Sequence, residues 1–175
     1  MSEDKVIIVD QNDNQVGIME KMAAHQNGGT LHRAFSIFLF NKENQLLLQR
    51  RALSKYHSGG LWTNTCCSHP RPGESIIEAG TRRMKEELGI TCQLQEYFSF
   101  TYKANLDNEL TEYEFDHVLI GDFAGEASLN YEEVDSIKWL TLEEVKKLMI
   151  EQPNDFTVWF KIAFDEVEKH KLNRV

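Results

Sequence analysis

Residues 75–90 read SIIEAGTRRMKEELGI and form the most strongly patterned segment of this 175-residue chain. Ser75, followed three positions later by Glu78, is a capping box, the side-chain arrangement that opens a helix. Gly89 is the matching stop signal, because glycine readily adopts the left-handed conformation that ends a helix. We therefore predict a helix here, with two adjacent carboxylates at its end.

Helical spacing separates a buried face of this segment from an exposed one. The predicted buried stripe consists of Ile77, Gly80, Met84 and Leu88. At about 100° per residue, Glu87 lies roughly 60° from Met84, at the edge of that stripe, whereas Glu86 faces solvent. Arg83 stands one turn before Glu87 on the same flank. Arg83 and Glu87 form either a surface ion pair or a site where Glu87 binds a hard cation beside a diphosphate.

Further strands and helices are predicted on both sides of this segment. The strands cover residues 5–10, 33–40, 46–51, 96–103, 112–123 and 136–140. A second capping box, Thr141 with Glu144, predicts a helix that ends before Pro153. Apolar side chains at helical spacing over residues 156–167 predict a C-terminal helix. This order of elements indicates an α+β fold, with a single domain over residues 1–175 around a mixed sheet.

Composition and charge narrow the class of partner. The chain is 41% hydrophobic and 27% charged, as expected for a soluble globular protein, and no apolar run approaches 18 residues. A net charge of −9 argues against nonspecific binding to nucleic acid or to anionic membranes. An anionic substrate would need a local cationic pocket or a bound metal. Three cysteines, of which Cys66 and Cys67 are adjacent, are a poor disulfide framework and fit reduced thiols in the cytoplasm.

Several side chains able to bind metal or move protons stand outside the helix. Glu112 and Glu114 are two positions apart on a predicted strand, so both project from the same face. Two carboxylates are costly to bury unless they are protonated or bind a metal. Together with His25, His32 and His69 they would form a mixed nitrogen and oxygen set suited to zinc, manganese or iron. Each histidine alone is more often structural or exposed, and spacing alone does not show that the five converge.

The segment over residues 82–90 resembles the end of the Nudix box, G-x5-E-x7-R-E-U-x-E-E-x-G-U, where U is aliphatic. Counting back, Glu74 matches the first Glu of the box. Two positions depart from the pattern, since Ser68 replaces the Gly and Arg83 replaces the Glu after the first Arg. Nudix hydrolases use the box carboxylates to gather cations and activate water. Arg83 therefore weakens a hydrolase interpretation and favours a phosphate-binding role.

A second resemblance covers residues 1–170, which are similar to the type 1 isopentenyl-diphosphate isomerases, a non-hydrolytic branch of the Nudix superfamily. It is carried in order by EK (20–21), His25, Leu31-His32, QRRALSK (49–55), GLWTN (60–64), CSHP (67–70), GES (73–75), RRMKEELG (82–89) and EYE (112–114). The resemblance implies a Nudix-type fold, in which a mixed sheet is layered between helices.

The resemblance also implies roles for particular side chains. One divalent metal, Mn²⁺ or Zn²⁺, would be bound by His25, His32, His69, Glu112 and Glu114. Glu87 would bind a Mg²⁺ that also touches the diphosphate, and the diphosphate clamp would consist of Lys21, Arg51, Lys55 and Arg83. Cys67 and Glu114 would be the catalytic pair, with Tyr102 as a candidate helper.

Two further side chains have competing interpretations. Trp159 either offers its π face to a carbocation or packs in the apolar stripe of Phe156, Phe160 and Phe164. Cys66 has no role in the family pattern and is expected to be a small buried residue.

The activity implied is the interconversion of isopentenyl and dimethylallyl diphosphate by protonation and deprotonation, a supply reaction for isoprenoid biosynthesis. The partner would be this small substrate, with neither nucleic acid nor membrane, and the chain would be a monomer or a weak homodimer. The main alternative is a Nudix diphosphohydrolase, and a third is a catalytically silent metal- or nucleotide-binding domain. The sequence leaves open which proton-transfer group acts first, the native metal, the direction of flux and the role of Cys66.

Overall fold

The computed structural model describes residues 4–55 and 57–171. The strands are β1 (Lys5–Val9), β2 (Gln15–Glu20), β3 (His32–Phe40), β4 (Gln45–Arg51), β5 (Trp62–Thr63), β6 (Cys66–Ser68), β7 (Gln95–Asn105), β8 (Thr111–Asp122) and β9 (Val134–Thr141). The helices are α1 (Lys21–Ala24), α2 (Ile76–Leu88), α3 (Leu142–Glu151) and α4 (Val158–Lys171), with a 3₁₀ turn at Pro153–Asp155. The predicted domain span stays a prediction, because its two ends lie outside the described residues.

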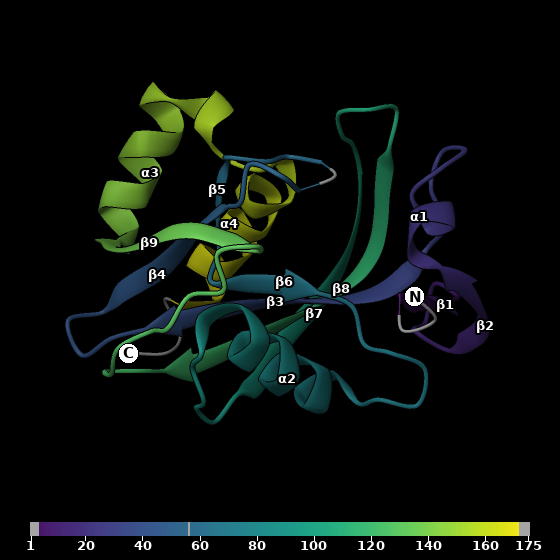
Figure 1. Ribbon diagram of the computed structural model, residues 1–175, viewed down its shortest axis with the longest axis horizontal. Coiled ribbons are helices and arrows are strands. Elements are labelled where there is room, and N and C mark those ends of the chain that lie inside the picture. Colours follow the sequence, from purple (N-terminus) through teal and green to yellow (C-terminus); the bar gives the residue numbers. More distant parts are fainter. Residues whose placement is uncertain (1–3, 56, 172–175) are drawn as a thin grey trace.

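The sheet lies between two helical layers, with α2 on one side and α3 and α4 on the other (Figure 1). Alternation along β3 produces this arrangement, because successive side chains of a strand point to opposite faces. Phe35, Ile37 and Leu39 pack toward α2 in one core cluster. Phe38 and Phe40 pack on the other face, in a cluster that includes residues of α3 and α4. The predicted mixed sheet between helices is therefore confirmed.

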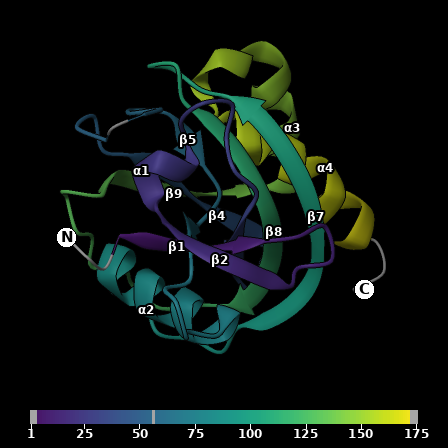
Figure 2. The same ribbon diagram turned by 90° about the vertical axis from the view of Figure 1, so that its right-hand side faces the viewer.

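Strand β3 is the centre of the sheet. It runs parallel to β8, in a register that pairs His32 with Glu114 and continues to Phe40 and Asp122. It also pairs antiparallel with the short β6, where Ser36 lies opposite Cys67. Strands β7 and β8 form a long curved ribbon beside α4 (Figure 2). Together these pairings bring candidate site residues from four strands to one end of the sheet.

The predicted helix over residues 75–88 is confirmed as α2. Ser75 Oγ accepts from the Glu78 N–H at 3.1 Å, and the Glu78 carboxylate accepts from the Ser75 N–H at 2.9 Å, so the capping box is complete. Gly89 has a φ of 64°, in the left-handed region, and its N–H donates to Lys85 O.

One position of the predicted buried stripe was wrong. Ile77 is 38% exposed, because it lies in the first turn of α2, where Ile76 packs against the core instead. Gly80, Met84 and Leu88 are buried as predicted, and Ala79 joins them. Glu86 is exposed, whereas Glu87 is buried. None of the helices in the described part of the chain is long and apolar enough to cross a membrane.

Candidate active site and metal centre

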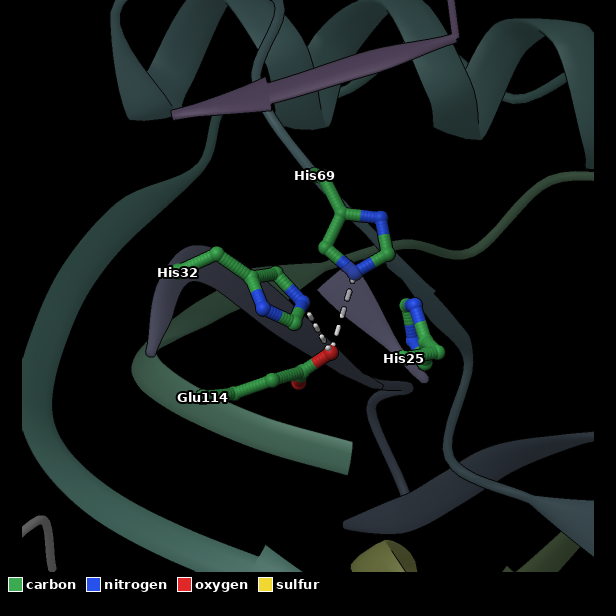
Figure 3. A group of neighbouring side chains, drawn as sticks. All are labelled: His25, His32, His69 and Glu114. Atoms are coloured by element: carbon green, nitrogen blue, oxygen red, sulfur yellow. Dashed lines mark hydrogen bonds and ion pairs between the residues drawn. The ribbon is translucent and has the colours of Figure 1, made fainter. Parts of the chain in front are cut away.

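Four of the predicted metal ligands converge (Figure 3). His25, His32, His69 and Glu114 each offer one ligand atom, and these atoms all lie within 4.8 Å of one another. Glu114 Oε2 is 2.9 Å from His69 Nε2 and 3.4 Å from His32 Nε2. His32 and Glu114 face each other across the β3–β8 pair, His25 follows α1, and His69 follows β6. Residues far apart in sequence thus form one compact group.

Backbone carbonyls set the orientation of two of these imidazoles. His25 Nδ1 is 2.7 Å from Lys21 O, and His32 Nδ1 is 2.7 Å from Thr30 O. A carbonyl oxygen only accepts hydrogen bonds, so in each ring Nδ1 carries a proton, and in the neutral imidazole Nε2 then keeps its lone pair. Among the described residues, the buried His32 Nε2 makes no hydrogen bond. This is the tautomer and the orientation that a metal-binding histidine requires.

Glu112 lies beside this group. Its Oε2 is 3.9 Å from His25 Nε2, and His25, His57 and Glu112 form a second close set of ligand atoms. The Tyr102 hydroxyl contacts both carboxylates, Glu112 and, at 2.7 Å, Glu114. The five predicted ligands are therefore neighbours, although the ligand atoms form two overlapping sets.

The electrostatics of this cluster fit a divalent cation. Burial, and then the charge of Glu114, raise the pKa of Glu112. Burial alone would raise the pKa of Glu114 as well, but the contacts with His32 and His69 outweigh it and lower that pKa. Burial lowers the pKa of His69 to about 4, so the imidazole is neutral near pH 7. Two buried carboxylates this close together are costly to ionise at the same time, and a divalent ion would offset their charge.

Cys67 lies in the same cavity as this cluster. The Trp159 indole N–H donates to Cys67 Sγ at 3.3 Å, so Trp159 is at the site and packs with Tyr102 and Ala104. It is not part of the core cluster that holds Phe156, Phe160 and Phe164. Burial, and then the Asp116 carboxylate, raise the pKa of the Cys67 thiol. Cys66 is fully buried in the α2-side core, as expected of a small buried residue.

The four predicted diphosphate ligands line this cavity too. It has a volume of about 260 Å³, and its walls include Lys21, Arg51, Lys55, Arg83, Cys67, Glu87, Glu112, Glu114, His69 and Trp159. Arg83 pairs with Glu87 one turn later, and its guanidinium is also 3.4 Å from Glu133 Oε2. Glu87 is only 5% exposed, so this pair faces the cavity and is not a surface ion pair. The Arg51 guanidinium lies 5.1 Å from the centre of the Trp159 ring.

Among the cavity residues to which sequence reasoning gave no role, three bear most directly on the site. Glu133 Oε2 lies 2.5 Å from Lys55 Nζ, and Gln49 Nε2 donates to Glu87 Oε1 at 2.9 Å. His57 also lines the cavity, and burial lowers its pKa to about 3. Gln49 is the first residue of the QRRALSK motif (49–55), and His57 follows the motif by two positions. Closeness to this motif was therefore the signal that could have identified both residues. Glu133 stands in an acidic stretch with no distinguishing pattern.

Comparison with known proteins agrees with this geometry. A NUDIX domain model matches residues 30–160. Isopentenyl-diphosphate Delta-isomerase 2 of Aromatoleum aromaticum is 50% identical over 165 residues, which cover 94% of this chain and 87% of that protein. Isopentenyl-diphosphate Delta-isomerase of Burkholderia multivorans is 45% identical over 172 residues, covering 98% and 97%.

A solved structure supports the fold alone. The crystal structure of DR0079 from Deinococcus radiodurans aligns with a TM-score of 0.70 at 21% identity, over 85% of this chain and 90% of that one. The assignment to a family depends instead on the NUDIX domain match and on the two relatives that align over nearly the whole chain. This chain belongs to the NUDIX family and, within it, to the isopentenyl-diphosphate Delta-isomerases.

Proposed function

We propose that this chain interconverts isopentenyl diphosphate and dimethylallyl diphosphate and so supplies isoprenoid biosynthesis. The observation that carries the proposal is a single cavity in which a thiol, a buried carboxylate pair and seven Lys and Arg side chains meet. Moving a carbon–carbon double bond requires one proton to be added and another to be removed. Every step is a proton transfer, so neither nicotinamide nor flavin is needed.

The proton-transfer pair would be Cys67 and Glu114. Strand β3 lies between the strands that carry them, because it pairs with β6 on one side and β8 on the other. That placement suits groups that act on opposite sides of a small alkene. Tyr102 contacts Glu114 through its hydroxyl and would help to hold the carboxylate and its proton in place. Trp159 would stabilise the cationic intermediate with its ring.

Two metal ions complete the proposed site. His25, His32, His69, Glu112 and Glu114 would hold Mn²⁺ or Zn²⁺, and Glu87 would hold Mg²⁺ together with the diphosphate. Such ions supply positive charge, which offsets the buried carboxylates and the substrate phosphates. Glu114 would thereby be held in one orientation toward the cavity.

Diphosphate binding would depend on Lys21, Arg51, Lys55 and Arg83. The chain carries a net charge of −9, so an anionic substrate gains from a local concentration of cations. Fixing the diphosphate in this cavity would hold the short hydrocarbon near the proton-transfer groups. Binding energy from the non-reacting part of the substrate would thus contribute to orientation at the reacting carbons.

Neither alternative function is favoured. A diphosphohydrolase would use the box carboxylate that Arg83 replaces. A silent binding domain would have no need of a thiol beside a buried carboxylate pair, yet Cys67 and Glu114 share one cavity. A cytoplasmic location, a monomeric or weakly dimeric state, and the absence of nucleic-acid and membrane partners belong to the proposal.

Proton NMR of isopentenyl diphosphate mixed with the protein and Mg²⁺ tests the activity directly. The alkene signals should change to those of dimethylallyl diphosphate until equilibrium is reached, with no cofactor added. A phosphorus spectrum of the same sample serves as the control for hydrolysis. Release of phosphate or of a monophosphate, without alkene migration, would show that the hydrolase interpretation is the correct one.

Cys67→Ala should abolish turnover, because it removes one of two proton-transfer groups while leaving the core and the histidine cluster in place. Cys66→Ala is the matched control, since it deletes the neighbouring thiol from the core side of the same strand. We expect Cys66→Ala to retain near wild-type kcat, with at most a modest loss of stability. Equal losses of kcat in the two variants would contradict the assignment of Cys67.

Arg83→Gln should raise KM for isopentenyl diphosphate more than it lowers kcat. Losing a charge-assisted hydrogen bond costs about 1.5–3 kcal/mol, so KM should rise about 10- to 100-fold. Arg33→Gln is the control, because Arg33 is not among the residues that line the cavity and is engaged by Asp13, through Nε to the carboxylate at 2.8 Å and through Nη2 to the carbonyl oxygen at 2.7 Å. Arg33→Gln should mainly lower the free energy of unfolding. An unchanged KM in Arg83→Gln would remove Arg83 from the diphosphate site.

A further inference from the structure

Asn64 lies between β5 and β6 and is fully buried. Its amide makes four hydrogen bonds. Nδ2 donates to Ile37 O and to Cys66 O, each at 3.1 Å. Oδ1 accepts from Thr63 Oγ1 at 2.9 Å and from the Cys67 thiol at 2.9 Å. No polar atom of this side chain is left for water or substrate.

The orientation of the amide is fixed by its partners. Ile37 O and Cys66 O are both carbonyl oxygens, which only accept hydrogen bonds, so the NH₂ group must face them. A flipped amide would place its own oxygen against two other oxygens. The oxygen of Asn64 is therefore held toward Cys67 Sγ. Because this oxygen is itself only an acceptor, the contact requires the thiol proton to lie between sulfur and oxygen.

The same oxygen ends a longer chain of hydrogen bonds from α4. The Phe160 N–H donates to Thr157 Oγ1 at 3.3 Å, Thr157 Oγ1 donates to Thr63 Oγ1 at 3.0 Å, and Thr63 donates to Asn64. Each hydroxyl in this chain uses its single proton once. From the other direction, Trp159 of α4 donates to Cys67 Sγ at 3.3 Å, and the thiol donates to Asn64. Two hydrogen-bonded routes therefore connect the first turn of α4 to the thiol, one through Thr157, Thr63 and Asn64 and the other through Trp159.

We propose that Asn64 is a positioning residue for isomerisation, which fixes the sulfur and the S–H direction of Cys67 relative to Trp159 and the cavity. The proposal rests on the proposed function for its kinetic consequence. The thiol orientation itself is a property of the resting protein. A misplacement of about 1 Å between reacting groups can cost about 100-fold in rate, so fixing the sulfur at this point has a direct effect on turnover.

The infrared S–H stretching band of the substrate-free protein tests the orientation. Cys67→Ala identifies the Cys67 band among those of the three thiols. Asn64→Ala should move that band to higher frequency, because the thiol loses its acceptor at 2.9 Å and is left with Ser36 Oγ, which is 3.8 Å away. Thr63→Val should move it to lower frequency, because the thiol becomes the sole donor to Asn64 Oδ1 and its hydrogen bond strengthens.

The control is Thr65→Val. Thr65 is also fully buried and bridges Leu39 N and Leu47 O, at 3.0 and 2.6 Å, without contacting the thiol. It should lower stability without moving the Cys67 band. Opposite shifts in Asn64→Ala and Thr63→Val support the proposal. An unmoved band in Thr63→Val, or shifts of the same sign in both variants, would overturn it, and Thr63→Val alone decides the matter if Asn64→Ala does not fold.

The kinetic arm follows isomerisation by the same variants. Asn64→Ala should lower kcat about 10- to 100-fold with KM within about twofold of wild type, because the diphosphate site is untouched. A purely structural role would instead lower stability alone, as in Thr65→Val. If the wild-type protein does not isomerise the substrate, the proposed function fails while the infrared result still reports on Asn64. Wild-type kcat in Asn64→Ala, together with a shifted band, would overturn the positioning role.

Discussion

The parallel pairing of β3 with β8 is the constraint on which the site depends. Its register sets His32 opposite Glu114, and β7 sets Tyr102 opposite Glu114 from the other side. A shift of one residue would turn these side chains to the opposite face of the sheet. The same strand places Ser36 opposite Cys67 on β6. One strand therefore fixes the distance between the imidazole cluster and the thiol.

Packing of the hydrophobic core stabilises this register and offsets the unfavourable free energy of burying the polar groups of the site. Buried carboxylates at Glu112, Glu114 and Asp116 lie close together at one end of the sheet, an arrangement that opposes folding unless protons or cations compensate. The apolar side chains of β3 lie on both faces and pack against α2 and against α3 and α4. A metal that binds the folded cluster would add to stability by mass action, so metal binding and folding should be linked.

Sequence patterns within a segment predicted the long helices and strands. They did not predict the short strands, or contacts between residues that are far apart in the sequence. The capping boxes located α2 and α3, and apolar runs located β3 and β8. Strands β5 and β6 have two and three residues, too few for a periodic pattern, and β2 alternates mostly exposed side chains. At the site, the spacing of Glu112 and Glu114 predicted a shared face. The convergence of His25, His32 and His69 depends on non-local pairing, and only the family resemblance anticipated it.

The proposed metal site of the histidine cluster depends on the register of β3 and β8. Anomalous diffraction from substrate-free crystals loaded with Mn²⁺, recorded on both sides of the manganese absorption edge, would locate the ion. We expect the strongest peak within bonding range of nitrogen or oxygen atoms of His25, His32, His69, Glu112 and Glu114. A peak held by His57 with His25 and Glu112, and out of bonding range of His32 and Glu114, would contradict this expectation.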